Sequence, residues 1–145
     1  MLFEPLELKD KLLRNRVVAA PLASKSAGPD GGPTEKSLDI YNRFSASGVG
    51  MVVAEHHSVS RCGSVRPEQF LADSDEAAKR NAEMAEVIKK NGAAALVQIN
   101  HGGAQVADPA VFDNQDYRAL SPSGVPVGKC WASLKQKPEV LTSGE

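Results

Sequence analysis

The stretch Ala93-Ala94-Ala95-Leu96-Val97-Gln98-Ile99-Asn100-His101-Gly102-Gly103 decides the fold of this chain. Its first part is an almost continuous apolar run, which is typical of a strand covered on both faces in a parallel sheet. Its last part is polar and rich in glycine, which suits a loop at the carboxyl end of such a strand, where ligands bind. The stretch therefore predicts a buried strand over 93–100 followed by a functional loop.

Two earlier stretches show the same pattern of an apolar run that ends in polar or small residues. Val17-Val18-Ala19-Ala20 is a small apolar run that ends at Pro21, which cannot donate a hydrogen bond to a strand ladder. Gly50–Glu55 is a second run, and it ends in His56-His57-Ser58. Both predict strands buried on both faces, and both place polar or small residues at the carboxyl end of the strand.

The segments between these strands are predicted to be helices. Thr34 is placed to cap the first, which ends at Gly48. Asp73, with Glu76 three residues later, is a partial capping box for the second, which ends at Asn91-Gly92. The apolar residues at helical spacing that should face the sheet are Leu38, Tyr41, Phe44, Ala77, Met84 and Ile88.

The order of elements predicts an α/β fold. A hairpin over residues 3–13 comes first, and strands then alternate with helices, which favours a parallel sheet covered by helices. Residues 60–73 are predicted to be a loop, and residues 104–138, which contain four prolines, to be mostly irregular. Thr142 is predicted to cap a helix that begins near the last residue of the chain.

Size and composition exclude several classes of protein. The chain has 145 residues, one ordinary domain, and a net charge of −1, so it has no electrostatic footprint for nucleic acid or an anionic membrane. No apolar run approaches the roughly 18 residues of a membrane span, and the first residues lack the features of a signal peptide. Cys62 and Cys130 have no metal-binding spacing and are predicted to be reduced thiols of a cytoplasmic protein.

Gln98 is the most informative candidate residue. A carboxamide within an apolar strand costs free energy unless it is paired, and it offers both donors and acceptors. A flat heterocycle with alternating N–H and C=O groups would pair with it, and so would neighbouring backbone; the residues alone leave both open. His56 and His57 are adjacent on a strand and face opposite ways, so we predict no metal site there.

Together these residues resemble the old yellow enzyme family of FMN-dependent oxidoreductases, which includes NAD(P)H:flavin oxidoreductases and 2-enoate reductases. Val97–Gly103 is similar to the family's Gln-Leu-x-His-Ala-Gly-Arg signature, with Ala104 in place of the arginine. The other matching segments, in order, are Leu2–Leu6, Leu13–Val18, Ala20–Leu22, Tyr41, Gly48–Gly50, Glu55, Ser74–Glu76, Asn91-Gly92, Ser121–Ser123 and Pro138–Thr142.

The resemblance implies a (β/α)8 TIM barrel with FMN at its C-terminal mouth. It implies that Ala20, Pro21, Leu22 and Ala23 line the flavin and that Gln98 bonds the flavin's pyrimidine edge. His56 stands where the family usually has a small residue near the flavin, and Ala23 where it often has Cys or Thr. Lys25 stands where some members place a substrate-contacting Tyr. The reaction implied is hydride transfer from NAD(P)H through FMN to an activated alkene.

A whole barrel needs about 250 residues, so residues 1–145 are expected to form an incomplete N-terminal portion of one FMN-binding barrel domain: the hairpin, about three strands and two helices. The family's substrate-binding His/Asn pair and phosphate cradle come from later strands, so no catalytic residue is assigned here. We expect a completing polypeptide or a homo-oligomer to supply the missing strands. The alternative is a truncated, non-catalytic half-barrel that acts as a structural or interaction module.

Overall fold

Strand β4 (Met51–Ser58) is the centre of a parallel sheet in the computed structural model, which describes residues 1–107, 118–126 and 138–143. Strand β3 (Val18–Ala19) pairs with the start of β4, and β5 (Phe70–Leu71) pairs with its end. Strand β6 (Ala94–Asn100) pairs along nearly the whole of β4, on the other edge. All of these pairings are parallel, so the carboxyl ends of the strands meet at one edge of the sheet.

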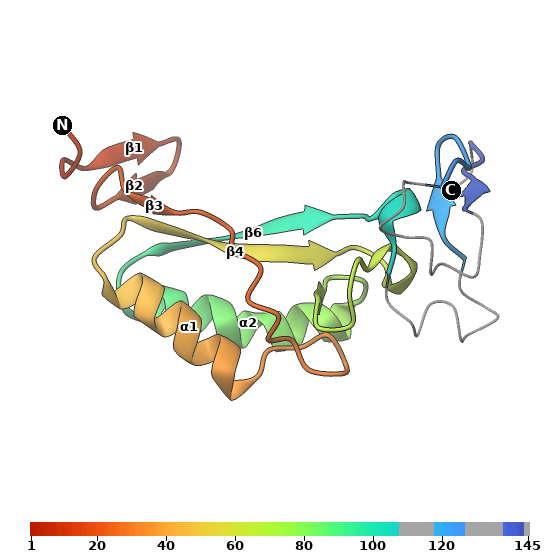
Figure 1. The fold of residues 1–145 in the computed structure, drawn as a ribbon. Helices are drawn as coiled ribbons and strands as arrows, with labels where there is room; N and C mark the ends of the chain where they lie inside the picture. Colours follow the sequence, from red (N-terminus) through yellow and green to blue (C-terminus); the bar gives the residue numbers. More distant parts are fainter. Residues whose placement is uncertain (108–117, 127–137, 144–145) are drawn as a thin grey trace.

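Two helices, α1 (Glu35–Ala46) and α2 (Asp75–Lys90), cover one face of this sheet (Figure 1). Each buries an apolar stripe against β4, as the spacing predicts, and the buried core is Tyr41, Val52, Ala54, Phe70, Met84, Ile88 and Ala93. No helix of the described residues lies on the other face, which we call the open face of the sheet. Neither helix is long and apolar enough to cross a membrane.

The two helices begin and end at the residues that the sequence predicted, with one exception. The Thr34 side chain accepts the Ser37 N–H, and Ser37 Oγ accepts the Thr34 N–H, which completes a capping box at α1. Helix α2 is capped by Ser74, whose Oγ accepts the Ala77 N–H, so the prediction that Asp73 is the cap was wrong by one residue. Asp73 instead accepts a hydrogen bond from Ser74 Oγ.

The predicted burial of two strands was wrong. Val18 is 45% exposed, and Leu96, Val97 and Ile99 of β6 are 47%, 50% and 62% exposed. The reason is their position, because β3 and β6 are the outer strands of the described sheet and only β4 has a partner on both edges. The loop predicted over 60–73 also contains a short 3-10 helix, η1 (Arg61–Gly63), and strand β5.

The described residues after β6 contain little regular structure, as predicted, while residues 108–117 and 127–137 of the segment predicted to be irregular lie outside the described residues. A 3-10 helix, η2 (Gly103–Gln105), follows β6, and two short parallel strands, β7 (Leu120–Ser121) and β8 (Glu139–Val140), pair with each other. Residues 141–143 are not helical. Cys130 and the last two residues, where a helix capped by Thr142 was predicted to begin, lie outside the described residues.

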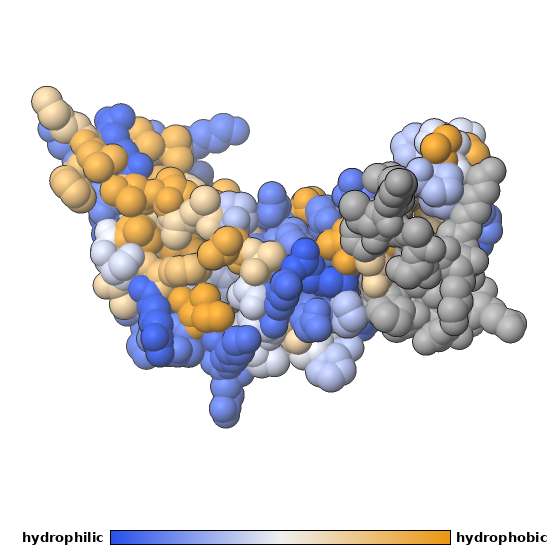
Figure 2. Space-filling model, in the orientation of Figure 1, coloured by the Kyte–Doolittle hydropathy of each residue, from blue (hydrophilic) through white to orange (hydrophobic). Residues whose placement is uncertain are grey.

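The predicted N-terminal hairpin consists of β1 (Leu6–Leu8) and β2 (Lys11–Leu13). It lies near the amino ends of the sheet strands (Figure 1), and Figure 2 shows apolar surface gathered there. Arg14, directly after β2, joins this hairpin to the helix layer. Its guanidinium donates to the backbone carbonyls of Ser45, Val49 and Asn91, at the carboxyl ends of both helices, where a cation is favourable.

We expect Arg14→Lys to lower the free energy of unfolding by about 1–2 kcal/mol, because an ammonium group cannot reproduce the planar fork that serves three carbonyls. Urea titration followed by circular dichroism measures this. Arg16→Lys is the matched control, since the exposed Arg16 side chain makes no hydrogen bond in the described structure. If both substitutions lowered the free energy of unfolding equally, the hydrogen bonds of Arg14 to the three carbonyls would not be the cause.

Candidate functional site

Three segments meet at the carboxyl edge of the sheet: residues 20–26 after β3, 55–58 at the end of β4, and 98–103 at the end of β6. The strand register brings them together. Val18 of β3 lies beside Met51, and His57 of β4 lies beside Ile99 of β6. In parallel α/β proteins this edge is where ligands bind, so the sequence-predicted site residues share the expected location.

Glu55 is the anchor of this edge. Its side chain is only 2% exposed, and its carboxylate accepts the Ser24 N–H at 2.9 Å, the Ser24 hydroxyl, and the Tyr41 hydroxyl at 3.2 Å. The Tyr41 oxygen in turn accepts the Glu55 backbone N–H at 2.8 Å. A single buried carboxylate thus ties the loop after β3, the strand β4 and the helix α1 to one another.

Burial raises the pKa of Tyr41 well above its ordinary value, and the charge of Glu55 adds to this effect, while the hydrogen bond from the Glu55 backbone opposes it. Tyr41 therefore remains protonated at any pH at which the protein is studied and keeps its donor role toward Glu55. The hydrogen bonds to the carboxylate compensate the cost of removing Glu55 from water.

The same anchor fixes the backbone around Lys25. Ser24 is held by Glu55, and Ser26 is held by its contact with Ser24 and by the Thr34 hydroxyl, which donates to the Ser26 carbonyl. Between them, Lys25 has a φ of +53°, the left-handed region that side chains rarely adopt. Lys25 is exposed, so its ammonium group is presented at the carboxyl edge, where the sequence predicted a substrate contact.

The two histidines of β4 face opposite ways, and a β-bulge in this part of the strand shifts their register with β6. The register shifts between Ala54 and His57, so Gln98 lies opposite two residues, Glu55 and His56. His57 turns to the helix face, stacks on Phe70 with ring centroids 4.9 Å apart, and donates from Nδ1 to the Glu55 carbonyl at 2.7 Å. His56 therefore lies on the open face, as the alternation of the strand predicted.

Both histidines are held in the neutral form. Desolvation lowers the pKa of His57, against the opposing effect of Glu55. The pKa of His56 is also lowered, first by desolvation and then by the positive charge of Arg66, with Glu55 again opposing. Among the described residues, no group of three or more His, Cys, Asp or Glu side chains is placed to hold a metal ion.

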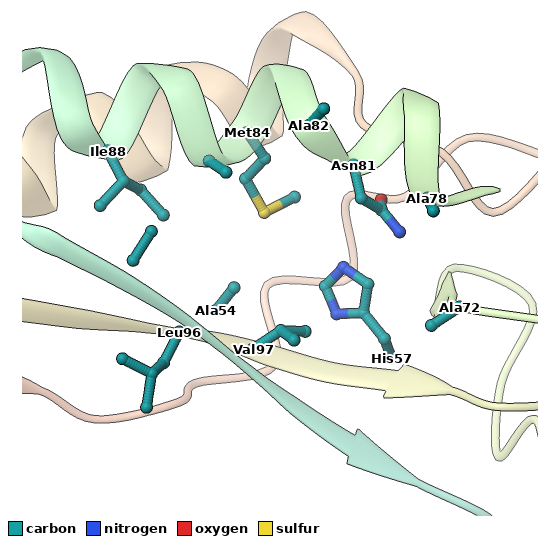
Figure 3. Close-up of a pocket in the computed structure, with 12 residues that line it drawn as sticks. Ala54, His57, Ala72, Ala78, Asn81, Ala82, Met84, Ile88, Leu96 and Val97 are labelled. Carbon is teal, nitrogen blue, oxygen red and sulfur yellow. The ribbon is translucent and has the colours of Figure 1, made fainter. Parts of the chain in front are cut away.

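A pocket of about 330 Å³ lies on the helix face, between α2 and strands β4 and β6 (Figure 3). Its lining is largely apolar and small, with His57 and Asn81 as its polar residues; the others are Ala54, Ala72, Ala78, Ala82, Met84, Ala85, Ile88, Ala95, Leu96 and Val97. His57 and Asn81 point toward one another in Figure 3. This pocket does not contain Gln98, Ala20–Ala23 or Lys25, so it is not the predicted cofactor site.

Gln98, one of the predicted cofactor residues, lies instead on the open face, two residues after Leu96, which points away from the helices in Figure 3. Gln98 is exposed, and its carboxamide makes no hydrogen bond within the described residues, so the pairing with neighbouring backbone that the sequence left open is not seen there. Gln98 was expected to be buried within the strand. It is exposed because β6 lies at the edge of the described sheet. Ala20, Pro21 and Leu22 are exposed and Ala23 is half-buried, in the segment that follows β3.

The family model described as "NADH:flavin oxidoreductase / NADH oxidase family" matches residues 1–138. This chain belongs to that family. The family uses FMN, with NADH or NADPH as the reductant. The predicted family resemblance is thereby confirmed.

Relatives with known names are much longer than this chain. An NADH oxidase of Thermoanaerobacter brockii is 29% identical over 145 residues, which cover 99% of this chain and 21% of that protein. An NADH:acrylate oxidoreductase of Vibrio harveyi is 33% identical over 113 residues, which cover 78% of this chain and 11% of that protein. The chain thus spans about a fifth or less of these relatives.

Solved structures confirm the fold class. The old yellow enzyme of Pichia sp. AKU4542 superposes with a TM-score of 0.86 at 19% identity, over 99% of this chain and 38% of that one. The old yellow enzyme of Trypanosoma cruzi gives 0.80 at 24% identity, over 98% and 42%. The described chain is accordingly a partial TIM barrel with an open sheet, as predicted.

Sequence reasoning missed two groups at this edge. Ser24 was assigned no role of its own, and its bonds to Glu55 could not be anticipated because they join residues 31 positions apart. Arg66 was also missed, and its position depends on Gln69, a residue with no recognisable motif. Gln69 is 1% exposed and links the loop of Arg66 to both β4 and β6.

We expect Glu55→Gln to lower the free energy of unfolding by about 2 kcal/mol, because an amide replaces a buried anion that accepts three hydrogen bonds. Chemical denaturation measures the change. Glu86→Gln on the exposed face of α2 is the control and should change stability by less than about 1 kcal/mol, since its ion pair with Lys89 is exposed. If Glu55→Gln left the free energy of unfolding unchanged, the Glu55 carboxylate would not be holding these segments together.

We expect the free energy of unfolding to decrease as the pH falls below about 6.5, by up to about 1.4 kcal/mol per pH unit for each histidine whose pKa is lowered by folding. The unfolded chain protonates its histidines first, whereas desolvation lowers the pKa of both His56 and His57 in the folded chain. His57→Gln should reduce this slope, and Gln105→Ala, at an exposed residue that does not titrate, should leave it unchanged. A slope that is identical in all three proteins would exclude His57 as its source.

Proposed function

We propose that this chain supplies the N-terminal, FMN-binding part of a cytoplasmic oxidoreductase that transfers hydride from NADH or NADPH through FMN to an activated alkene. One observation carries the proposal: Gln98 is exposed near the carboxyl end of β6, and its carboxamide makes no hydrogen bond within the described residues. Two named relatives, an NADH:acrylate and an NADH:fumarate oxidoreductase, act on alkenes that carry a carboxylate.

The residues present fit an isoalloxazine ring. Gln98 offers a donor and an acceptor side by side, which suits the alternating C=O and N–H groups of the pyrimidine edge. Ala20 and Ala23 are small, so their backbone can approach a flat ring closely. FMN, when bound, carries the hydride chemistry, and the protein supplies orientation and electrostatics. Glu55 contributes by fixing the loop of residues 20–26 through Ser24.

We further propose that the other strands of the barrel come from a completing polypeptide or a second copy of the chain. Within the described residues, β6 has a partner on one edge only, and its Leu96, Val97 and Ile99 side chains are exposed. An exposed apolar strand edge is a ready site for strand pairing. The groove between α2 and β6 is lined by alanines, which allow a further helix to approach closely.

The same uncovered edge also favours the second candidate, a non-catalytic half-barrel that acts through protein contacts. Such a module would use β6 and the groove as an interaction surface and would have no need of the Gln98 carboxamide. Flavin binding therefore distinguishes the two candidates.

The test is a titration of the purified chain with FMN, followed by absorbance between 300 and 600 nm, with the particle mass from light scattering. We expect flavin to co-elute with the protein and Gln98→Ala to weaken its binding about tenfold, the effect of one or two lost hydrogen bonds. Gln105→Ala, an exposed glutamine in η2, is the control. A folded chain that binds no flavin in any oligomeric state would favour the non-catalytic module.

A further inference from the structure

Strand β6 has a free edge that its own sequence does not protect. Within the described residues it pairs only with β4, so the backbone groups along its other side have no strand partner. Charged residues and proline usually protect such an edge, and Ala94–Asn100 contains neither. A seven-residue edge of this kind is a template for pairing with another strand.

The groove between α2 and β6 adjoins this free edge. Val97 lines the groove, and Ile99, which shares the register of His57, lies on the same face of β6; both are exposed. The opposite wall is the side of α2 that carries Ala78 and Ala82, which are exposed as well. An element that pairs with β6 and brings its own helix would therefore bury apolar surface in addition to the backbone edge.

The row of residues along this side of α2 complements itself. Ala78, Ala82 and Ala85 line the groove, and Asp75 and Lys89 extend the same row at spacings of three and four residues. Ala82 stands at the centre of the row, midway between Asp75 and Lys89. Two antiparallel copies of α2 that meet at Ala82 thus bring each Asp75 opposite Lys89 of the other copy.

A second pair of charges follows the same symmetry. Lys79 and Glu86 flank the row on either side of Ala82, so they also meet residues of opposite charge in the antiparallel arrangement. In the single chain they make exposed contacts within α2, Lys79 with Glu76 and Glu86 with Lys89. A surface whose charges match its own rotated image fits a second copy of the same chain.

We propose that two copies of this chain associate about a two-fold axis that passes close to Val97 of β6 and Ala82 of α2, which line the same groove. Antiparallel pairing centred on Val97 uses all seven residues of β6. It keeps Leu96 and Gln98 on the open face and Ile99 on the helix face, as the alternation of the strand requires. The two sheets become one continuous sheet, with the two α2 helices side by side over the seam (Figure 3).

The ordinary spacing of strands and helices agrees with this arrangement. Helix α2 lies over β4 and β6 and leaves the free edge uncovered. Since neighbouring strands are about 4.8 Å apart, the two α2 helices, each set back from the seam, would lie about 10 Å apart, within the range of packed helices. The alanines along the contact allow the helices to come closer than this, because the distance depends on the side chains between them.

This dimer goes beyond the proposed function. Its seam is antiparallel, so it extends the sheet and does not close a barrel, and a completing polypeptide would compete for the same edge. Gln98 remains on the open face of each copy. Association of two copies and binding of FMN are therefore separate properties that separate measurements test.

The experiment is analytical ultracentrifugation of the 145-residue chain at concentrations from about 1 to 200 μM. We expect a reversible dimer with a Kd of about 10 μM and no larger species, because a two-fold contact uses each edge once. Ala82→Arg should raise this Kd at least about tenfold, since it sets two bulky, like charges against each other. Ala46→Arg, at an exposed alanine of α1, is the matched control and should dimerise as the parent does.

Charge exchange and hydrogen exchange locate the contact. Lys89→Glu should weaken the dimer, and adding Asp75→Lys should restore it, because the double variant again sets opposite charges against each other. The amides of β6 that face the free edge should exchange more slowly in the parent dimer than in Ala82→Arg. Each variant should retain the circular dichroism spectrum of the parent, which separates a lost contact from a lost fold.

A chain that remains monomeric at about 200 μM would overturn the proposal. A dimer that Ala82→Arg leaves intact, or whose β6 amides exchange as fast as those of the monomer, would overturn it too, because the contact would then lie elsewhere on the chain. Particles that grow beyond the dimer with concentration would exclude a closed two-fold contact. None of these results bears on the FMN titration, so the two proposals fail independently.

Discussion

The rest of the site depends on one buried carboxylate. Glu55 accepts hydrogen bonds from Ser24 and Tyr41, and so it fastens the loop after the first sheet strand to the central strand and to helix α1. Two residues of β3 pair with β4, which is too short a ladder to fix a loop by itself. Glu55 holds Ser24, and the Thr34 hydroxyl holds the Ser26 carbonyl, so these contacts on either side keep Lys25 in its left-handed backbone conformation at the carboxyl edge.

The bulge at Glu55 and His56 separates two environments. His57 enters the helix layer, where it stacks on Phe70 and closes one end of the apolar groove under α2. His56 remains on the open face with Gln98, near the half-buried Arg66. Because neighbouring residues of a strand face opposite ways, two chemically identical side chains lie in different surroundings, one packed under the helices and one on the open face.

The sheet is covered on one face and uncovered on the other, because helices α1 and α2 lie on the same side of it (Figure 1). Arg14 strengthens the covered side by bonding the carboxyl ends of both helices, while β6 presents apolar residues that have no partner within the described chain. The superposition on old yellow enzymes, over about two fifths of their length, explains this asymmetry. In a TIM barrel the helices form the outer ring, so the face left open here corresponds to the inside of the barrel.

The sequence by itself determined the elements whose signals are local. The alternation of apolar runs and helical stripes predicted the hairpin, the strands and both helices, and Thr34, Gly48 and Asn91-Gly92 marked helix ends correctly, because caps depend on neighbours a few residues away. The tertiary structure alone decided what depends on distant contacts. Strand β5, the bulge, the exposure of β3 and β6, and the meeting of Arg66 with His56 arise from register and from the side chain of Gln69. These contacts join segments that are far apart in the sequence, so no local pattern records them.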